Sequence, residues 1–271
     1  MTWSQMQPLL AEGCWDTLFM VGWSSLIAVL GGLPLGVLLV LTDRGELLQN
    51  APVNKIVGVV VNIGRSFPFI VLMVALIPFT RWVVGTSIGA EATVVPLAVG
   101  AIPFYARLVE TAVREVDGGL VEAAQSMGAG TWTIVRKVLL PQSLPSLVAG
   151  FTTTVIALIG YSAMAGAIGG GGLGSLALTY GYQRFETDFM LVTVALLIVL
   201  VTAVQVLGDL AARAIARRGR ATSATPRTPL RRLRTRGTRG AAQTEAADLP
   251  AAAPKTFSPT SPDPSPGGTT Q

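Results

Sequence analysis

Residues 119–145 read GLVEAAQSMGAGTWTIVRKVLLPQSLP, a charged amphipathic stretch that lies between two long apolar runs. The segment cannot cross a bilayer, because a spanning helix needs about 20 predominantly apolar residues. Apolar side chains recur at helical spacing from Leu120 to Met127, and Gly128 predicts the end of that helix. Thr131 is then expected to cap a second helix, which Pro141 should end. The pattern predicts a helix-turn-helix that docks on one face of a membrane.

The side chains of this segment suit a partner that approaches closely. Ala123 and Ala124 are small enough to let another backbone come near, and Met127 is an adaptable apolar contact. Glu122 lies near the helix start and offers a charge for a basic partner. Trp132 is expected to share one face with the apolar residues that follow it. An ordinary amphipathic helix at a membrane surface would show the same spacing, so the spacing alone leaves both interpretations open.

The composition identifies an integral membrane protein. Of the 271 residues, 51% are hydrophobic and 13% are charged. An ordinary soluble domain has a charged share of about 25%.

Several classes of chemistry are excluded by the residues that the sequence lacks. It has no histidine and only Cys14, so an internal disulfide, a Cys/His zinc site and a histidine-based triad cannot form. No GxxxxGK[ST] phosphate loop occurs, so ATP-driven work requires a partner chain. We therefore expect no catalytic residue, metal or cofactor here.

The apolar runs predict an all-α membrane protein with five spans, preceded by an extracytoplasmic segment over residues 1–17. The expected spans cover about residues 18–41, 56–79, 92–113, 147–168 and 189–210. The glycines from Gly166 to Gly174 lie at the end of the fourth span and just after it, and they predict a flexible break or a re-entrant turn. Arg65 lies within the second span. It either has a function there or snorkels to the cytoplasmic interface.

Basic residues predict the orientation. The loops after spans one and three and the region after span five hold ten of them: Arg44, Lys55, Arg107, Arg114, Arg136, Lys137, Arg213, Arg217, Arg218 and Arg220. The loops after spans two and four hold one each, Arg81 and Arg184. By the positive-inside rule, the N-terminus lies outside, and the docking segment and the C-terminus lie in the cytoplasm.

Residues 213–271 form a basic segment that leads into a Pro/Ala/Thr-rich tail. They hold eleven Lys/Arg against three acidic residues, whereas the rest of the chain holds nine against twelve. Residues 221–271 have too few large apolar side chains to fold, so we expect disorder there. Directly after a span, the partner expected for the bases is the anionic membrane lipid rather than nucleic acid. The tail either tethers to that lipid or is passive.

The docking segment resembles the EAA loop of ABC importer permeases. The residues that carry this resemblance are Glu122-Ala123-Ala124, Gly128, Ile134 and Leu140-Pro141. Further phrases resemble the methionine branch of that family: NIGRSFPFI at 62–70, IPFTR at 77–81, VGTSIG at 84–89, VRKVLLP at 135–141 and GYSAM at 160–164. The resemblance covers roughly residues 9–217.

The resemblance implies a permease subunit that imports D- or L-methionine into the cytoplasm across a bacterial plasma membrane. It implies a homodimer, two ATP-binding subunits docked on the paired loops, and an extracytoplasmic methionine-binding protein. The ATPase-coupling residues it implies are Glu122, Ala123, Ala124, Met127, Gly128 and Thr131.

The end of the fourth span holds a candidate gate. Tyr161, Ser162 and Met164 stand among small residues, and a flexible thioether can fill an irregular gap and then withdraw. Met164 either plugs a passage in this way or packs against a neighbouring helix.

Three alternatives to methionine import remain. The solute could be another small amino acid or a peptide-like compound. A secondary transporter is a weaker possibility, because the central part of each expected span lacks the carboxylates that bind coupling ions. A membrane scaffold is the third.

Overall fold

The computed structural model describes residues 3–222, with side chains described for residues 3–217. Within that range the chain is helical, with connecting loops and no strand. The elements are α1 (Trp3–Leu41), α2 (Ala51–Ser66), α3 (Phe69–Ala75), α4 (Ile77–Val84), α5 (Ala90–Arg114), α6 (Gly118–Ser126), α7 (Thr131–Ile134), the π-helical turn η1 (Val135–Leu139), α8 (Leu140–Ala165), the 3₁₀ turn η2 (Gly166–Ile168), α9 (Gly172–Leu176), the π-helical η3 (Ala177–Gln183) and α10 (Thr187–Thr222). The all-α prediction is confirmed for these residues.

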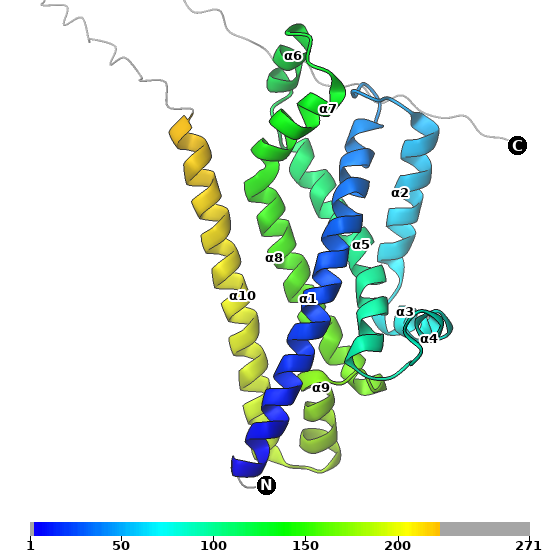
Figure 1. Cartoon of the computed structure of the whole chain (residues 1–271), viewed down its shortest axis with the longest axis vertical. Coiled ribbons are helices and arrows are strands. Elements are labelled where there is room, and N and C mark those ends of the chain that lie inside the picture. The colour runs from blue at the N-terminus through cyan, green and yellow to red at the C-terminus, as the bar shows by residue number, and fades with distance from the viewer. Residues whose placement is uncertain (1–2, 223–271) are drawn as a thin grey trace, which may run out of the picture. The chain divides into compact units, whose positions relative to one another are not determined.

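Among residues 3–222, four helical stretches are long and apolar enough to cross a membrane: Trp3–Leu41, Ala90–Arg114, Thr131–Ile168 and Thr187–Arg217. A fifth crossing results if α2 and α3, which meet at a bend of 102°, count as one span. Figure 1 shows α6 and α7 at the end of the helical bundle where α1 leads into α2, and α9 at the opposite end beside the start of α1.

The second expected span, over residues 56–79, is not one straight helix. α2 ends at Ser66, Phe67 is extended with φ −74° and ψ 127°, and α3 begins after Pro68. Proline lacks the N–H that would continue the helix and restricts the residue before it to extended conformations. Proline can be tolerated inside a span, as at Pro34 within the continuous α1, but the extended Phe67 breaks the helix here.

α1 and α5 form the centre of the bundle because glycines let their backbones approach. A Cβ on Gly32 would lie 2.9 Å from the carbonyl oxygen of Ile102, and one on Gly36 would overlap Ala106 and Val109. Such small residues at helix contacts are typical of membrane bundles. α8 packs on the same pair, and α10 packs on α8 while leaving most of its apolar surface exposed.

The first and last helices extend beyond the expected spans. Residues 3–17, part of the segment expected to be extracytoplasmic, belong to α1, and Met6 and Leu10 pack in one cluster with Leu173 and Phe189. At the other end, α10 continues past residue 210, where the fifth span is expected to end, into the basic segment that begins at residue 213. The expected disorder over residues 221–271 lies outside the described residues, apart from the two that end α10.

The glycine-rich segment after α8 is a tight turn and not a flexible break. The backbone N–H of Gly170 donates to the carbonyl of Ala165 at 2.9 Å, and that of Gly89 donates to Gly169 at 2.9 Å. Thr17 of α1 accepts a hydrogen bond from the backbone N–H of Leu173 at 3.0 Å. The turn therefore joins α8, α9, α1 and the start of α5.

Candidate functional site

The docking segment folds as two helices joined by a glycine turn. Asp117 caps α6 by accepting a hydrogen bond from the N–H of Gly119 at 2.8 Å. After Met127, Gly128 has φ +78° and its N–H donates to the carbonyl of Gln125 at 2.8 Å. This left-handed glycine is a helix-closing conformation, so the predicted stop is confirmed.

One residue of α6 is buried against the rest of the chain, while the side chains next to it are exposed and can contact a partner. Ala124 is buried against Ile134, Val135 and Leu139. Exposed side chains surround Ala124 and form what we call the docking surface: Leu120, Glu122, Ala123, Met127 and Trp132. Met127 is 81% exposed and Trp132 is 73% exposed. Large apolar groups at such exposure are typical of a surface that a partner covers.

Three local predictions in this segment are wrong. Gly130 precedes the first residue of α7, so Thr131 lies inside the helix and is not its cap. Trp132 is exposed and does not share the buried face of Val135 and Leu139. Pro141 does not end the helix, because the π-helical turn η1 leads directly into α8 and places the proline in its first turn, where a missing N–H is tolerated.

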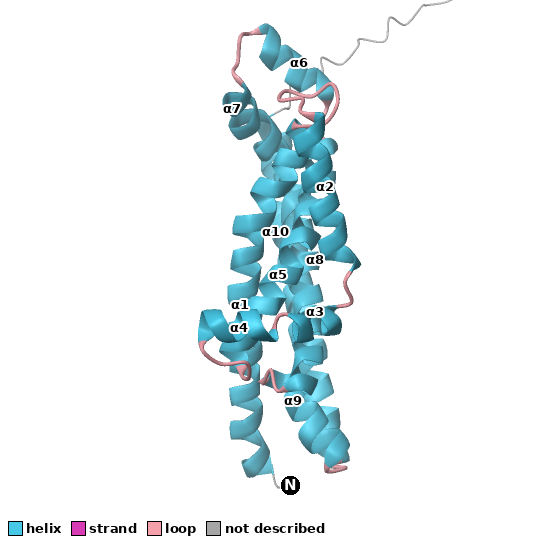
Figure 2. Cartoon of the chain, turned by 90° about the vertical axis from the view of Figure 1, so that its right-hand side faces the viewer, coloured by secondary structure: helices cyan, strands magenta, loops and turns pink. Residues whose placement is uncertain are grey.

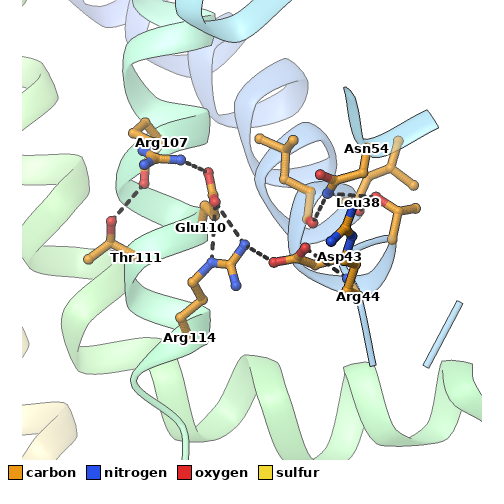
Figure 3. Close-up of polar contacts among 10 residues, drawn as sticks. Leu38, Asp43, Arg44, Asn54, Arg107, Glu110, Thr111 and Arg114 are labelled. Atoms are coloured by element: carbon orange, nitrogen blue, oxygen red, sulfur yellow. Dashed lines mark hydrogen bonds and ion pairs between the residues drawn. The ribbon is translucent and has the colours of Figure 1, made fainter. Parts of the chain in front are cut away.

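A cluster of four charged side chains ties the loop after α1 to the end of α5 (Figure 3). Glu110, which is 5% exposed, accepts hydrogen bonds from Arg107 at 2.6 Å and from Arg114 at 3.1 and 3.2 Å. Arg114 also donates to Asp43 at 2.7 Å. This bond from Arg114, and then the one from the backbone N–H of Arg44, hold the pKa of Asp43 below its usual value. The cluster fixes the last turn of α5 just before the chain enters α6.

A cavity of about 260 Å³ lies between this charged cluster and α6. Arg114 and Glu46 line one part of it, and Glu122 and Gln125 of α6 line another. The carboxylate of Glu122 therefore belongs to the docking surface and also borders the end of the bundle. Figure 2 shows α6 and α7 together at this end, remote from α9.

The candidate gate residues lie within four positions of α8 but have different surroundings. The ring of Tyr161 stacks on that of Phe69 of α3 at 4.7 Å and 10°. Ser162 is buried and donates to the carbonyl of Ile159 at 2.8 Å, whereas Met164 is 54% exposed. Ser162 and Met164 therefore differ in exposure, since the serine is buried and the methionine is exposed in the single chain.

Comparison with known proteins decides what kind of site this is. The family described as "Binding-protein-dependent transport system inner membrane component" matches residues 32–221, from the C-terminal part of α1 to the end of α10. This chain belongs to that family. It is therefore a membrane component of a transport system and not an enzyme.

Relatives and solved structures extend this match over the permease. This chain is 53% identical over 210 residues to the "Probable D-methionine transport system permease protein MetI" of Vibrio cholerae, and the match covers 78% of this chain and 93% of that protein. It is 51% identical over 181 residues to the "Methionine import system permease protein MetP" of Bacillus subtilis, covering 67% of this chain and 82% of that protein. A structure of the MetNI methionine ABC transporter in an inward-facing conformation matches with a TM-score of 0.78 and 49% identity, covering 79% of this chain and 99% of that one.

Sequence reasoning missed the charged cluster in this permease. The spacing of Arg107, Glu110 and Arg114 along one helix could have indicated their mutual contact, since residues three and four apart share a helix face. The contact of Arg114 with Asp43 spans 71 residues, and no local pattern indicates it.

Proposed function

We propose that this chain is the permease subunit of an ATP-driven importer that moves methionine, in its D or L form, into the cytoplasm. The observation that carries the proposal is the 49% identity with a methionine ABC transporter over 99% of that chain, at a TM-score of 0.78. The relatives named for methionine or D-methionine transport support the same substrate. Another small amino acid or a peptide-like solute is the alternative.

The function test uses the permease reconstituted in liposomes with its ATPase. A panel of binding proteins, each loaded with one solute, is added in turn, and ATP hydrolysis and uptake are measured. We expect the methionine-loaded protein to give the largest stimulation and ATP-dependent methionine uptake. Stimulation by a different loaded protein, with no methionine uptake, would favour the alternative substrate.

The proposed assembly has two copies of this chain, two ATP-binding subunits and one extracytoplasmic binding protein. The ATPase docks on the exposed docking surface, where Glu122, Ala123 and Met127 contact it directly. The buried Ala124 determines how closely α6 packs against the bundle, and Gly128 and Thr131 determine the angle between α6 and α7. ATP hydrolysis resides on the partner chain.

We propose five spans, with α2 and α3 forming the second as a bent pair. The N-terminus lies outside, and the docking segment and the C-terminus lie in the cytoplasm. The support is the concentration of Lys and Arg at the α6 and α7 end and after α10. The plasma membrane of a bacterium is the proposed location, with lipid contacting the exposed apolar surface of α10.

Cysteine labelling tests this orientation in a Cys14→Ser background, which removes the native thiol. A membrane-impermeant maleimide should label Thr86→Cys in intact cells and should not label Gly130→Cys. Both positions are exposed, and φ −70° at Gly130 accepts a side chain, so accessibility within the protein does not limit either reaction. Permeabilised cells provide the control, in which both should react. Labelling of Gly130→Cys in intact cells would refute the orientation.

We propose that Met164 closes the passage between two subunits, with Tyr161 and Ser162 supporting it. Its 54% exposure in the single chain leaves the side chain free to meet a second copy. Met164→Ala should therefore raise the passive leak of methionine from loaded liposomes without ATP. Met127→Ala removes a more exposed methionine at the docking end and should not change the leak. A stable Met164→Ala variant that leaks no more than wild type is incompatible with the gate.

A further inference from the structure

A cavity of about 180 Å³ lies at the bend between α2 and α3. Residues from four helices line it: Gly64 and Arg65 of α2, Phe69 of α3, Gly100 and Phe104 of α5, and Tyr161 of α8. Nothing in the docking segment contributes to it. The cavity thus combines one guanidinium with aromatic rings in the part of the chain that crosses the membrane.

Close packing gives the cavity rigid walls. A Cβ on Gly64 would lie 2.7 Å from the side chain of Pro103, so α2 lies tightly against α5 at this point. A Cβ on Gly100 would lie 3.3 Å from Leu72 of α3. The stacked rings of Phe69 and Tyr161, with centroids 4.7 Å apart, join α3 to α8. Rigid walls let a small ligand bind without a large cost in ordering the site.

Arg65 is a cation without a counter-charge in this cavity. Among the side chains that the structure describes, Glu110 pairs with Arg107 and Arg114, whereas no carboxylate forms an ion pair with Arg65. An arginine at membrane depth is costly and is normally retained for a role. The C-terminal turn of α2 offsets part of that cost, because the helix dipole favours a cation there.

Snorkelling to the cytoplasmic interface does not explain Arg65. α2 begins at Ala51, at the same end of the bundle as the docking segment, and Arg65 comes fourteen residues later. At about 1.5 Å per residue this is about 21 Å of helix, which exceeds the length of an arginine side chain. Arg65 lines the cavity and is exposed in the single chain, so its guanidinium is open to water or to a ligand that enters there.

We propose that this cavity is a substrate subsite in which Arg65 binds the carboxylate of the transported amino acid. The inference rests on the proposed function and names the residues that hold its substrate. A guanidinium binds a carboxylate through two parallel hydrogen bonds, and it keeps its charge at any physiological pH. Phe69, Phe104 and Tyr161 provide rings that contact the rest of the amino acid, and a thioether makes favourable contacts with ring edges.

The size and position of the cavity fit a shared site on the transport path. Its volume of about 180 Å³ lies below the roughly 300–1,000 Å³ typical of a complete ligand pocket. A second copy of the chain would supply the remaining wall in the proposed dimer. Tyr161 lies three residues before Met164 on α8, so the subsite adjoins the proposed gate. Substrate released from the binding protein would meet Arg65 next to that gate.

The test measures methionine moved per ATP hydrolysed by the full complex in liposomes, with the loaded binding protein in excess. Arg65→Gln should lower this ratio about 10-fold or more, because a charged hydrogen-bonding pair is lost, while stimulated ATP hydrolysis stays within about twofold of wild type. Arg81→Gln is the matched control. It removes an arginine on α4 that does not line the cavity, and it should leave both rates within about twofold.

Each outcome bears on the subsite. Wild-type coupling in Arg65→Gln, or a parallel fall of uptake and ATP hydrolysis, would overturn it, since the second result indicates a structural role. Should Arg65→Gln fail to assemble, Arg65→Lys decides. It keeps the charge but not the two-point geometry, and we expect the ratio to fall about threefold or more. A wild-type ratio in Arg65→Lys would overturn the subsite. A wild-type complex that hydrolyses ATP yet moves no methionine would refute the proposed function instead.

Discussion

Gly174→Val should abolish accumulation of the folded permease. A Cβ at Gly174 would overlap the Cα, carbonyl carbon and carbonyl oxygen of Ala163, and all three atoms belong to the backbone of α8. A second glycine shows the same close packing between these segments, because a Cβ on Gly166 would overlap the backbone of Ser175. No rotamer change relieves an overlap with backbone, so α8 and α9 would have to separate. Overpacking of this kind costs about 3 kcal/mol or more, a large share of the roughly 5–15 kcal/mol that stabilises a typical domain.

The measurement is the yield and melting temperature of the purified permease in detergent, followed by size-exclusion chromatography. Gly22→Ala is the control, because nothing lies within 4 Å of the Cβ position of this helical glycine. It should match or slightly exceed the stability of wild type, since alanine is the better helix former. The turn between α8 and α9 would not be close packed if Gly174→Val purified in normal yield and melted at the wild-type temperature.

Gly128→Val should abolish most transport while leaving the bundle folded. Nothing lies within 4 Å of the Cβ position of Gly128, so the substitution meets no steric barrier from neighbouring residues. The obstacle is φ +78°, which a β-branched residue resists. A left-handed conformation costs a residue with a Cβ about 1–2 kcal/mol, which lowers the population of the native turn about 5- to 30-fold. We expect ATP-driven uptake to fall by a similar factor, because α6 and α7 no longer present one surface.

Two variants in the same turn separate conformation from bulk. Gly130→Val adds the same side chain at φ −70° and ψ 157°, which valine adopts readily, and should retain most uptake. Gly128→Asn should recover much of the activity, since asparagine tolerates the left-handed region. Affinity of the binding protein for its solute should be unchanged throughout. Normal uptake by a stably expressed Gly128→Val complex would argue that the angle between α6 and α7 does not transmit ATPase motion.

Local patterns predicted the helix stop at Gly128 because that stop depends on one residue's own backbone freedom. They wrongly predicted that Thr131 caps a helix and that Pro141 ends it, because the π-helical turn η1 joins α7 to α8 and makes the helix continuous there. The candidate gate was predicted as one group, yet burial divides it. Ser162 is buried and donates to the backbone of its own helix, whereas Met164 is exposed.

By itself, the sequence determined the class of the protein and the approximate position of most long helices, since apolar runs and their spacing act within a few turns of one helix. The expected third span at 92–113 coincides with α5, Ala90–Arg114. Tertiary structure alone decided the contacts between distant segments. These are the ion pair of Asp43 with Arg114, the hydrogen bond from the N–H of Leu173 to Thr17, and the meeting of four helices at the cavity that Arg65 lines. These contacts depend on where the chain returns after a bend or turn, and that path is set by packing, which no local period encodes.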